Sequence, residues 1–542
     1  MDRLTRPLLM AAFLALLAPP LLAPVPPLLD YPNHLARWHI LVDAMVHGRD
    51  HPYYEVAWGQ AWINSAVDML AVALGALLGA DRAGTVILCL AIVLPPAGAV
   101  ALNRVIFRGW HWWQIGFPML SWNGSLVIGL ISFQIGIGLA FVLAAWGHAR
   151  LRKRGPVVRF VARAAASALL LLVHPFAAAF HAVLLGGLAL GRRAPWRGGP
   201  GWIGRRGVAI GLAALACALP VFLYLAVTPV PPGSALPEGM EPPGVDVAGT
   251  AARVVAAVMP LLAGVMTYDI PVDIAFTIGF LLIMAAGAAS ARGHAGLLSA
   301  AAGIAALSVI APGYFLDNGM TNWRIGATIP LTLAMSLHPG ASVFRDRSVM
   351  RVGAVALGLA VVLRAGWIGA VWYRSQTDVA AVVRTLARAE PDSKILIADA
   401  ISSSEEAAEL PIHRTTATRF PLYWHVPALA AARRSAFVPT LFAMAGKQPL
   451  RVRPALAALT ALDAKPTSVI NLAVPEDELQ SYIDRTPQMY FWRYLRRWRD
   501  DFDYVLLLNA DQPPRGEADA RVPAGDLLAD EGFAQLWRIR RR

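Results

Sequence analysis

Long apolar segments, separated by short basic or Pro/Gly-rich breaks, dominate the first two thirds of the chain. Hydrophobic residues make up 57% of the 542 residues and charged residues only 15%. The mean hydropathy is +0.51. Segments this apolar need a nonpolar solvent along their whole length, so the pattern predicts a polytopic α-helical membrane protein rather than a soluble enzyme.

Basic residues indicate which ends of these segments share a side. Arg3 and Arg6 precede the first apolar segment, and "HARLRKRG" and "GRRAPWRGGPGWIGRR" hold dense later runs of arginine. Because such loops stay in the cytoplasm, we expect the N-terminus to be cytoplasmic. We expect the protein to lie in the inner (plasma) membrane of a bacterium. The net charge of +13 then reports topology, and we expect no nucleic-acid partner.

The same rule predicts about eleven crossings. We expect an uncleaved first helix, with a cleaved signal peptide as the less favoured alternative. The stretch 157–190 lies between two basic loops, so it must enter and return, with its turn at His174. Asp81 and Arg82 should form a short inner turn. The predicted segments are 7–29, 61–80, 83–102, 113–147, 157–190, 207–227, 271–290, 295–312, 325–338 and 351–372.

The last third of the chain follows a different pattern. "KILIAD" and "DYVLLLN" have strand length, "QLWRIRR" alternates, and "PEDELQSYIDR" begins like a helix. We therefore expect a transmembrane domain at 1–372 and a small α/β domain, outside the cytoplasm, at 373–542. Cys89 and Cys217 lie inside apolar segments, so neither a disulfide nor a zinc site is expected.

The stretch "LLDYPNHLARWHIL" places polar groups directly after the first apolar segment. Asp30 precedes Pro32, and His34 and Arg37 follow at positions i+4 and i+7, which share one face of a helix. One interpretation is structural, in which Asp30 caps the helix and its neighbours form a solvated face. The other is functional, with Asp30 as a catalytic carboxylate and His34 and Arg37 beside it to bind or orient substrate. The sequence leaves both open.

An acidic residue just after the first membrane helix, opening an external loop at 30–60, resembles the C-type (GT-C) membrane glycosyltransferases. The many spans and the external C-terminal domain resemble that family too, whereas its commoner Asp-Glu or Asp-x-Asp pairs are absent, so we expect a divergent bacterial branch. The resemblance implies transfer of a sugar from a polyprenyl-phosphate donor, with inversion, to a lipid, polysaccharide or protein. It implies that Asp30 is the catalytic base, or the ligand of a divalent metal ion if one is used.

Other residues would face the same outer side. We expect Arg324 to bind the lipid phosphate, with Asp317 nearby in "FLDNGMTNWR", and His174 to bind or orient substrate. The structural alternatives are that Arg324 extends to lipid headgroups and that His174 is a packing residue. Glu55 is a second candidate carboxylate, although its aromatic neighbours also suit a membrane interface.

Two functions from other classes remain open. A transporter or flippase of a lipid-linked or polar substrate would also need polar residues inside the membrane domain, usually at mid-membrane depth. A non-catalytic protein of envelope assembly would use the outer domain for contacts. Asp30→Asn separates these from an enzyme, because Asn still caps a helix but is a poor base.

Overall fold

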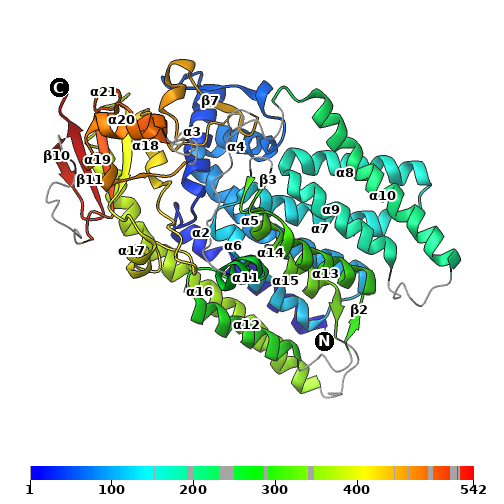
Figure 1. The fold of residues 1–542 in the computed structure, drawn as a ribbon. Helices are drawn as coiled ribbons and strands as arrows, with labels where there is room; N and C mark the ends of the chain where they lie inside the picture. The colour runs from blue at the N-terminus through cyan, green and yellow to red at the C-terminus, as the bar shows by residue number, and fades with distance from the viewer. Residues whose placement is uncertain are drawn as a thin grey trace.

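The chain folds into a large helical part followed by a small α/β part (Figure 1). The computed structural model describes residues 2–151, 153–191, 200–230, 250–285, 291–315, 318–339, 347–444, 446–461, 464–485, 492–512, 522 and 525–541. The predicted fold class, a polytopic helical domain with a C-terminal α/β domain, is confirmed.

The helical part contains helices of very different length. Its α-helices are α1 (Asp2–Ala15), α2 (Ala18–Leu22), α3 (Tyr31–His47), α4 (Ser65–Leu78), α5 (Ala80–Phe107), α6 (Gly124–Val127), α7 (Ile131–Arg150), α8 (Pro156–Val173), α9 (Pro175–Leu190), α10 (Pro200–Val227), α11 (Thr250–Val258), α12 (Ile270–Ala285), α13 (Ala295–Ile310), α14 (Thr321–Ala327), α15 (Ile329–Met335) and α16 (Arg347–Leu386). Short 3₁₀ helices and strand pairs connect them: η1 (Trp58–Gln60), η2 (Trp112–Ser121), η4 (Met259–Leu262), β1 (Tyr54–Val56) with β7 (Leu450–Val452), β2 (Arg292–Gly293) with β5 (Leu337–His338), and β3 (Tyr314–Phe315) with β4 (Asn318–Gly319).

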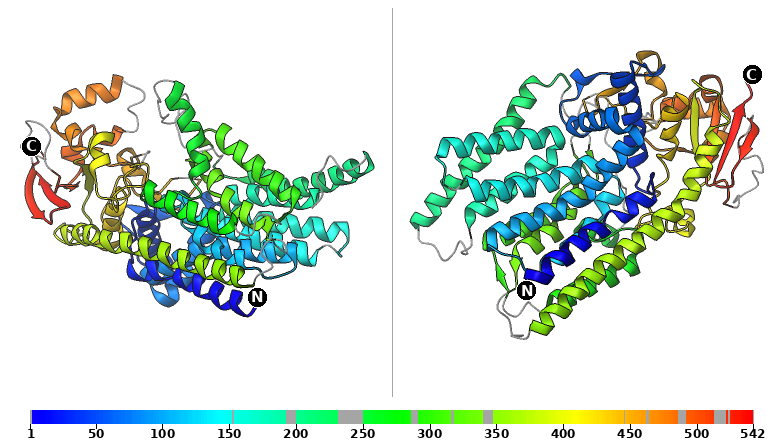
Figure 2. Two further views of the ribbon diagram at one scale, coloured as in Figure 1. Left: turned by 90° about the horizontal axis from the view of Figure 1, so that it is seen from below. Right: turned by 180° about the vertical axis from the view of Figure 1, so that it is seen from behind.

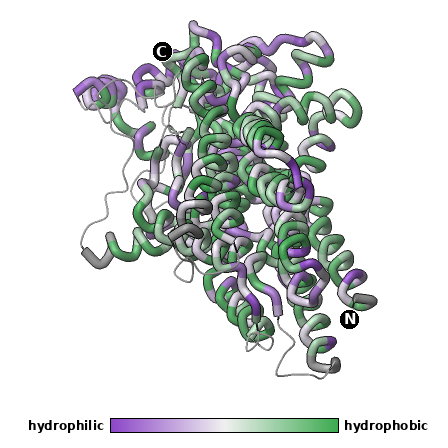
Figure 3. The backbone as a smooth tube through the Cα atoms, turned by 90° about the vertical axis from the view of Figure 1, so that its right-hand side faces the viewer, coloured by the Kyte–Doolittle hydropathy of each residue, from purple (hydrophilic) through white to green (hydrophobic). Residues whose placement is uncertain are grey.

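Six helical segments in the described residues are long and apolar enough to cross a membrane: Leu4–Leu22, Ala80–Phe107, Ile131–Arg150, Pro156–Val173, Gly207–Val227 and Met350–Leu386. Four apolar helices are shorter: α4, α9, α12 and α13. Hydrophobic residues cover most of these helices (Figure 3). The chain is an integral membrane protein, but several of the expected passages are made by shorter or broken segments rather than by single long helices.

Small residues let α5 and α7 pack closely. A Cβ on Gly98 would lie 2.5 Å from the carbonyl oxygen of Gly138, and a Cβ on Gly138 would lie 2.5 Å from Leu94. Contact between Leu94 and Gly138, and between Gly98 and Phe141, means that the two helices run in the same direction. The segment between them must therefore return, and the predicted single passage at 113–147 is wrong. Residues 112–130, which include η2 and α6, are all buried and make that return.

The predicted hairpin at 157–190 is confirmed. Helices α8 and α9 are separated by His174, which is the last flanking residue of one and the first of the other. Pro175 cannot donate a backbone hydrogen bond and begins α9. The apex of the hairpin is therefore fixed at His174.

The predicted inner turn at Asp81 is wrong. Asp81 Oδ1 lies 2.9 Å from Nη2 of Arg433, which belongs to the α/β part, and 2.8 Å from Nε2 of His39 on α3. The turn between α4 and α5 therefore lies on the same side as the α/β part. Helix α4 has only 14 residues and packs beside α3 and α5 instead of crossing at 61–80. The predicted loop at 30–60 is largely the helix α3.

The α/β part is built on one five-stranded sheet in the order β10-β11-β9-β6-β8. The central strands, β6 (Ile395–Asp399) and β9 (Tyr504–Leu508), are parallel and entirely buried, as their apolar sequences predict. The other elements are β8 (Thr467–Ser468), β10 (Gly525–Asp530), β11 (Ala534–Ile539), α17 (Ser404–Glu409), α18 (Leu429–Arg434), α19 (Val469–Ala473), α20 (Glu476–Arg485), α21 (Trp498–Asp501), η6 (Val426–Ala428) and η7 (Pro454–Leu459).

Helix α16 joins the two parts. It runs beside α1 and α2 and ends next to the sheet (Figure 2). It continues without a break past residue 372, the boundary expected from the sequence, to Leu386. Beyond it, Arg414 contacts Asp378 of α16 at 2.7 Å and Asp511, after β9, at 2.8 Å. These ion pairs hold the α/β part against the end of α16.

Candidate functional site

The backbone around Asp30 is held by the segment before α7. The amide of Asp30 donates to the carbonyl of Ile128 at 2.9 Å. Gly129 has φ +85°, and a Cβ there would lie 2.7 Å from the Asp30 nitrogen, so the close approach needs glycine. Asp30 precedes α3, yet its side chain makes no capping hydrogen bond. The capping interpretation of Asp30 is therefore wrong.

The Asp30 side chain instead faces an imidazole from the α/β part. Its Oδ1 lies 3.3 Å from Nδ1 of His425, and the two side chains are 16% and 6% exposed. Nε2 of His425 donates to the carbonyl of Ala464 at 3.0 Å. Asp30 and His425 are 395 positions apart, so this contact depends on the docking of the α/β part against α3.

The carboxyl edge of the sheet positions His425. Asp399, at the end of β6, accepts hydrogen bonds from Tyr423 Oη at 2.8 Å and from Trp424 Nε1 at 3.0 Å. Asn509, after β9, donates to the other oxygen of Asp399 at 2.8 Å. Burial raises the pKa of Asp399, and these donors oppose the rise. The residues directly before His425 are thus fixed to the ends of two central strands.

Asn33 and Phe442 close the interface between the two parts at the site. The buried Asn33 donates to the carbonyl of Thr440 at 3.2 Å and accepts from the amide of Phe442 at 3.0 Å. The ring of Phe442 meets His425 and His34 edge-on, with centroids 4.9 and 6.4 Å apart. The segment 440–442 therefore has a fixed position beside Asp30.

Arg324 and His174 form the second half of the site. Nη1 of Arg324, on α14, lies 3.1 Å from Nε2 of His174. Burial lowers the pKa of Arg324 to about 10, and the Asp30 carboxylate opposes this change, so the guanidinium is charged at neutral pH. The sequence placed Asp30, His174 and Arg324 on one side, and the structure brings them together.

The ring of His174 lies next to two hydrogen-bond donors. Burial and the neighbouring Arg324 lower the pKa of His174 well below its usual value, so the ring is neutral. A neutral imidazole carries one N–H. Nε2 lies 3.1 Å from Nη1 of Arg324, and Nδ1 lies 3.2 Å from the amide of Phe176; both neighbours can only donate. The charged Arg324 is the stronger donor, so Nε2 accepts from it, and the remaining N–H groups of the held guanidinium suit an anionic oxygen.

His34 and Arg37 lie behind Asp30, with their polar atoms used inside the protein. Nη2 of Arg37 donates to Nδ1 of His34 at 2.9 Å, and His34 also hydrogen bonds the carbonyl of Gly129. Burial and the Arg37 charge lower the pKa of His34 well below its usual value. Arg37 forms a buried ion pair with Asp68 at 2.9 Å. His34 and Arg37 therefore fix the position of Gly129 beside Asp30.

Two other candidates do not join this group. Glu55 pairs with Arg451 where β1 meets β7, in a half-exposed position. Asp317 lies outside the described residues. The acidic stretch "MTYDIPVD" serves packing, because Asp273 forms a buried ion pair with Arg364 at 3.0 Å.

The donor set at Asp30 does not fit a divalent metal ion. Within the described residues, no group of three or more His, Cys, Asp or Glu side chains could hold one. Asp30 has one imidazole beside it, and it interacts electrostatically with the guanidinium of Arg324, a poor neighbour for a cation. We therefore derive no step through a metal.

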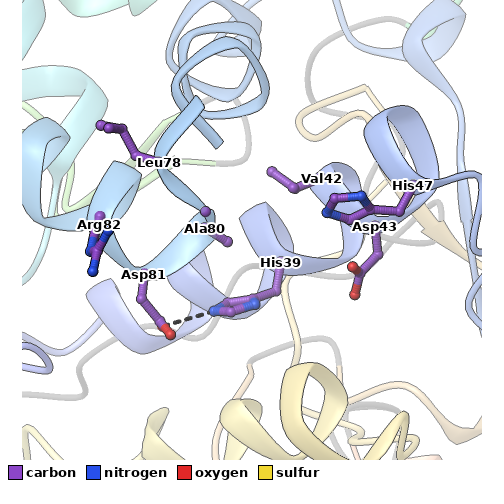
Figure 4. Close-up of a pocket in the computed structure, with 9 residues that line it drawn as sticks. His39, Val42, Asp43, His47, Leu78, Ala80, Asp81 and Arg82 are labelled. Carbon is purple, nitrogen blue, oxygen red and sulfur yellow. Dashed lines mark hydrogen bonds and ion pairs between the residues drawn. The ribbon is translucent and has the colours of Figure 1, made fainter. Parts of the chain in front are cut away.

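A cavity of about 350 Å³ lies elsewhere, further along α3 (Figure 4). Its lining includes His39, Asp43 and His47, which repeat every four residues on one face of α3, and Asp81 and Arg82 opposite them. Asp30 and His174 are not among the residues that line it. The cavity lies between α3 and the α4–α5 turn.

Sequence reasoning missed His425, Ala464 and Phe442. The signal that could have found them is weak: "YWHVP" is an aromatic-rich turn after the first strand of the α/β part. Its register against Asp30 depends on the docked fold. A motif search along the chain therefore does not reveal the partner of Asp30.

Comparison with known proteins gives a similarity in overall fold. No protein-family profile and no curated protein matches the chain. Among solved structures, the chain is similar to one described as ArnT from Cupriavidus metallidurans bound to undecaprenyl phosphate. The match covers 99% of this chain and 97% of that one, at 11% identity and a TM-score of 0.46. We take no residue role, substrate or reaction from a likeness this distant.

Proposed function

We propose that the chain is a membrane glycosyltransferase. It moves a sugar from a polyprenyl-phosphate donor to an envelope lipid, polysaccharide or protein on the periplasmic side. The observation that carries the proposal is the pairing of two unlike half-sites. One half is the carboxylate of Asp30 beside His425, and the other is the guanidinium of Arg324 beside His174.

The Asp30 half suits a hydroxyl group. An acceptor hydroxyl must lose its proton as its oxygen bonds to the sugar carbon. Asp30 is partly exposed and held by its backbone, so a hydroxyl can reach its carboxylate. A carboxylate in this role typically contributes about 10²–10⁴-fold to the rate.

The Arg324 half suits a phosphate. As the bond between the sugar carbon and the phosphate oxygen breaks, negative charge grows on the leaving polyprenyl phosphate. The guanidinium of Arg324, held by its hydrogen bond to His174, has further N–H groups that can donate to a phosphate oxygen. Phe176 lies under the guanidinium, 6.0 Å from the ring centroid, and limits its movement.

The proposed step balances within these groups. The sugar carbon loses its bond to the phosphate oxygen and gains one to the acceptor oxygen. The acceptor's proton passes to the Asp30 side, and the electron pair stays on the phosphate beside Arg324.

The test is mass spectrometry of envelope glycolipids and polysaccharides from a deletion strain. The strain carries wild type, Asp30→Asn, or the control Asp526→Asn, at matched membrane levels. Asp526 is an exposed residue of β10, so its change has the same chemistry outside the site. We expect one sugar to be absent in the deletion strain and in Asp30→Asn, and restored by wild type and the control.

Restoration by Asp30→Asn would overturn the proposal. Since the Asp30 side chain is not a helix cap, loss of a cap cannot account for a defect. A flippase would instead leave a complete lipid-linked sugar in the membrane. An assembly protein would tolerate the change altogether.

A further inference from the structure

The contact between Asp30 and His425 brings a carboxylate oxygen close to a ring nitrogen. The carbonyl of Ala464 can only accept, so Nε2 of His425 carries a hydrogen and donates it at 3.0 Å. In a neutral ring Nδ1 then holds a lone pair. That lone pair faces Oδ1 of Asp30 at 3.3 Å.

Nothing else in the described part of the protein occupies that lone pair. Nδ1 of His425 is buried and makes no hydrogen bond to any described residue. A lone pair and a carboxylate oxygen repel one another at this distance unless a proton lies between them. The geometry therefore leaves a position between Oδ1 and Nδ1 that a proton from the acceptor can enter.

The surroundings keep His425 in this orientation. Ala464 has φ +55°, an unfavourable conformation for a residue with a Cβ, and its carbonyl points to His425. Phe442 packs edge-on against the ring at 4.9 Å. Strain kept next to a candidate site, together with a locked ring, indicates a functional position rather than a loose contact.

We propose that Asp30 and His425 act as one proton-holding pair, in which His425 Nδ1 shares the proton that Asp30 takes from the acceptor hydroxyl. The proposal rests on the proposed function. The O–H bond of the acceptor breaks, the proton lies between Oδ1 and Nδ1, and Nε2 keeps its hydrogen on Ala464. The catalytic base is thus completed only when the α/β part is docked.

Charged groups around the pair fit this role. Arg324 interacts electrostatically with Asp30, His34 is neutral, and Lys447 lies near His174. These cations stabilise the phosphate after the donor bond breaks.

The first test is a double-mutant cycle on purified protein. The donor source is the total polar lipid extract of the parent membranes, and the readout is polyprenyl phosphate released, by mass spectrometry. We expect His425→Gln to lower the rate about tenfold or more, and Asp30→Asn to lower it further. The double variant should be no slower than Asp30→Asn, because the two residues act as a unit. His47→Gln, an exposed histidine of α3, is the control.

If the rate losses of the two single variants multiply in the double variant, the shared-proton proposal is overturned. Full activity of His425→Gln would overturn it too. In both cases the proposed function still stands as long as Asp30→Asn loses activity. Full activity of Asp30→Asn would overturn the proposed function itself. The two failures are therefore distinguishable.

The second test does not depend on turnover. In protein labelled with ¹⁵N-histidine, the Nδ1 signal of His425 is assigned by its loss in His425→Gln. We expect that signal to move in Asp30→Asn and to stay unchanged in Asp526→Asn. An unmoved signal in Asp30→Asn would show that no proton is shared, and this result would overturn the proposal even if His425→Gln were poorly folded in the assay.

Discussion

Replacing Arg37 by Met should destabilise the fold strongly, because its partner Asp68 is buried. The side chains of Arg37 and Asp68 are 4% and 1% exposed. Oδ1 of Asp68 accepts from Nε and Nη2 of Arg37 at 3.1 and 2.9 Å, and from Nε1 of Trp38 at 2.7 Å. Arg37→Met removes two charge-assisted hydrogen bonds and leaves a buried carboxylate with one donor. The expected loss is about 3–5 kcal/mol of unfolding free energy.

A double variant separates the loss of the ion pair from the cost of leaving a buried carboxylate unpaired. Changing both Arg37→Met and Asp68→Leu removes the pair without leaving a charge behind, and such replacements are often near neutral. We expect the double variant to recover most of the loss. Arg451→Met is the control, since its pair with Glu55 is half-exposed and should contribute about 0–1 kcal/mol.

The assay is unfolding in detergent by increasing fractions of dodecyl sulfate, followed by tryptophan fluorescence. A loss below about 1 kcal/mol for Arg37→Met would refute the reasoning, because a desolvated carboxylate cannot lose its main partner so cheaply. A double variant as unstable as Arg37→Met would also refute it.

Three further changes probe other parts of the account. Gly129→Ala should cost at least about 1–2 kcal/mol and lower transfer tenfold or more, since φ is +85° and the new Cβ would press on the Asp30 nitrogen; thermal unfolding and the lipid-extract assay check this. Burial lowers the pKa of His51 to about 4. The contribution of the neutral ring to the unfolding free energy is therefore complete above pH 6.5, and up to about 3 kcal/mol of it is lost as the pH falls from 6.5 to 4. His51→Gln should abolish that part of the difference in unfolding free energy between pH 7.5 and pH 4. Asn33→Ala should cost about 1–3 kcal/mol and expose the segment 440–442 to protease, because two buried groups lose their partner; unchanged cleavage would contradict it.

The elements of the α/β part could be predicted from local pattern. "KILIAD", "DYVLLLN" and "QLWRIRR" became β6, β9 and β11, because short apolar or alternating runs have few other ways to bury their side chains. In "SSSEEAAEL" the spacing of Ser402 and Glu405 predicts a capping box, but Ser403 and Glu406, one residue later, form it. Boundaries shift this easily where neighbouring residues have the same chemistry.

The membrane topology was only partly predictable. The α8–α9 hairpin followed from two flanking basic loops. The turn at Asp81 was misplaced because hydropathy cannot tell a short packed helix such as α4 from a span. Its true side is set by Arg433, which lies 352 positions away.

The candidate site could be predicted to the extent that its groups are marked locally. Asp30, His174 and Arg324 stand out because each interrupts or ends an apolar segment. His425 does not, since its role depends on a contact made by docking. Arg37 looked like a ligand group, but its buried partner Asp68 lay inside an apparent span.

The most direct measurement follows the donor itself. Purified wild-type protein and Asp30→Asn are each incubated with the polar lipid extract, and polyprenyl-phosphate sugar and free polyprenyl phosphate are quantified together. The account predicts conversion of one to the other by wild type and by Asp526→Asn, and a rate about 10²–10⁴-fold lower with Asp30→Asn. A donor that stays intact with folded wild-type protein would contradict the account. Equal conversion by Asp30→Asn would contradict it as well.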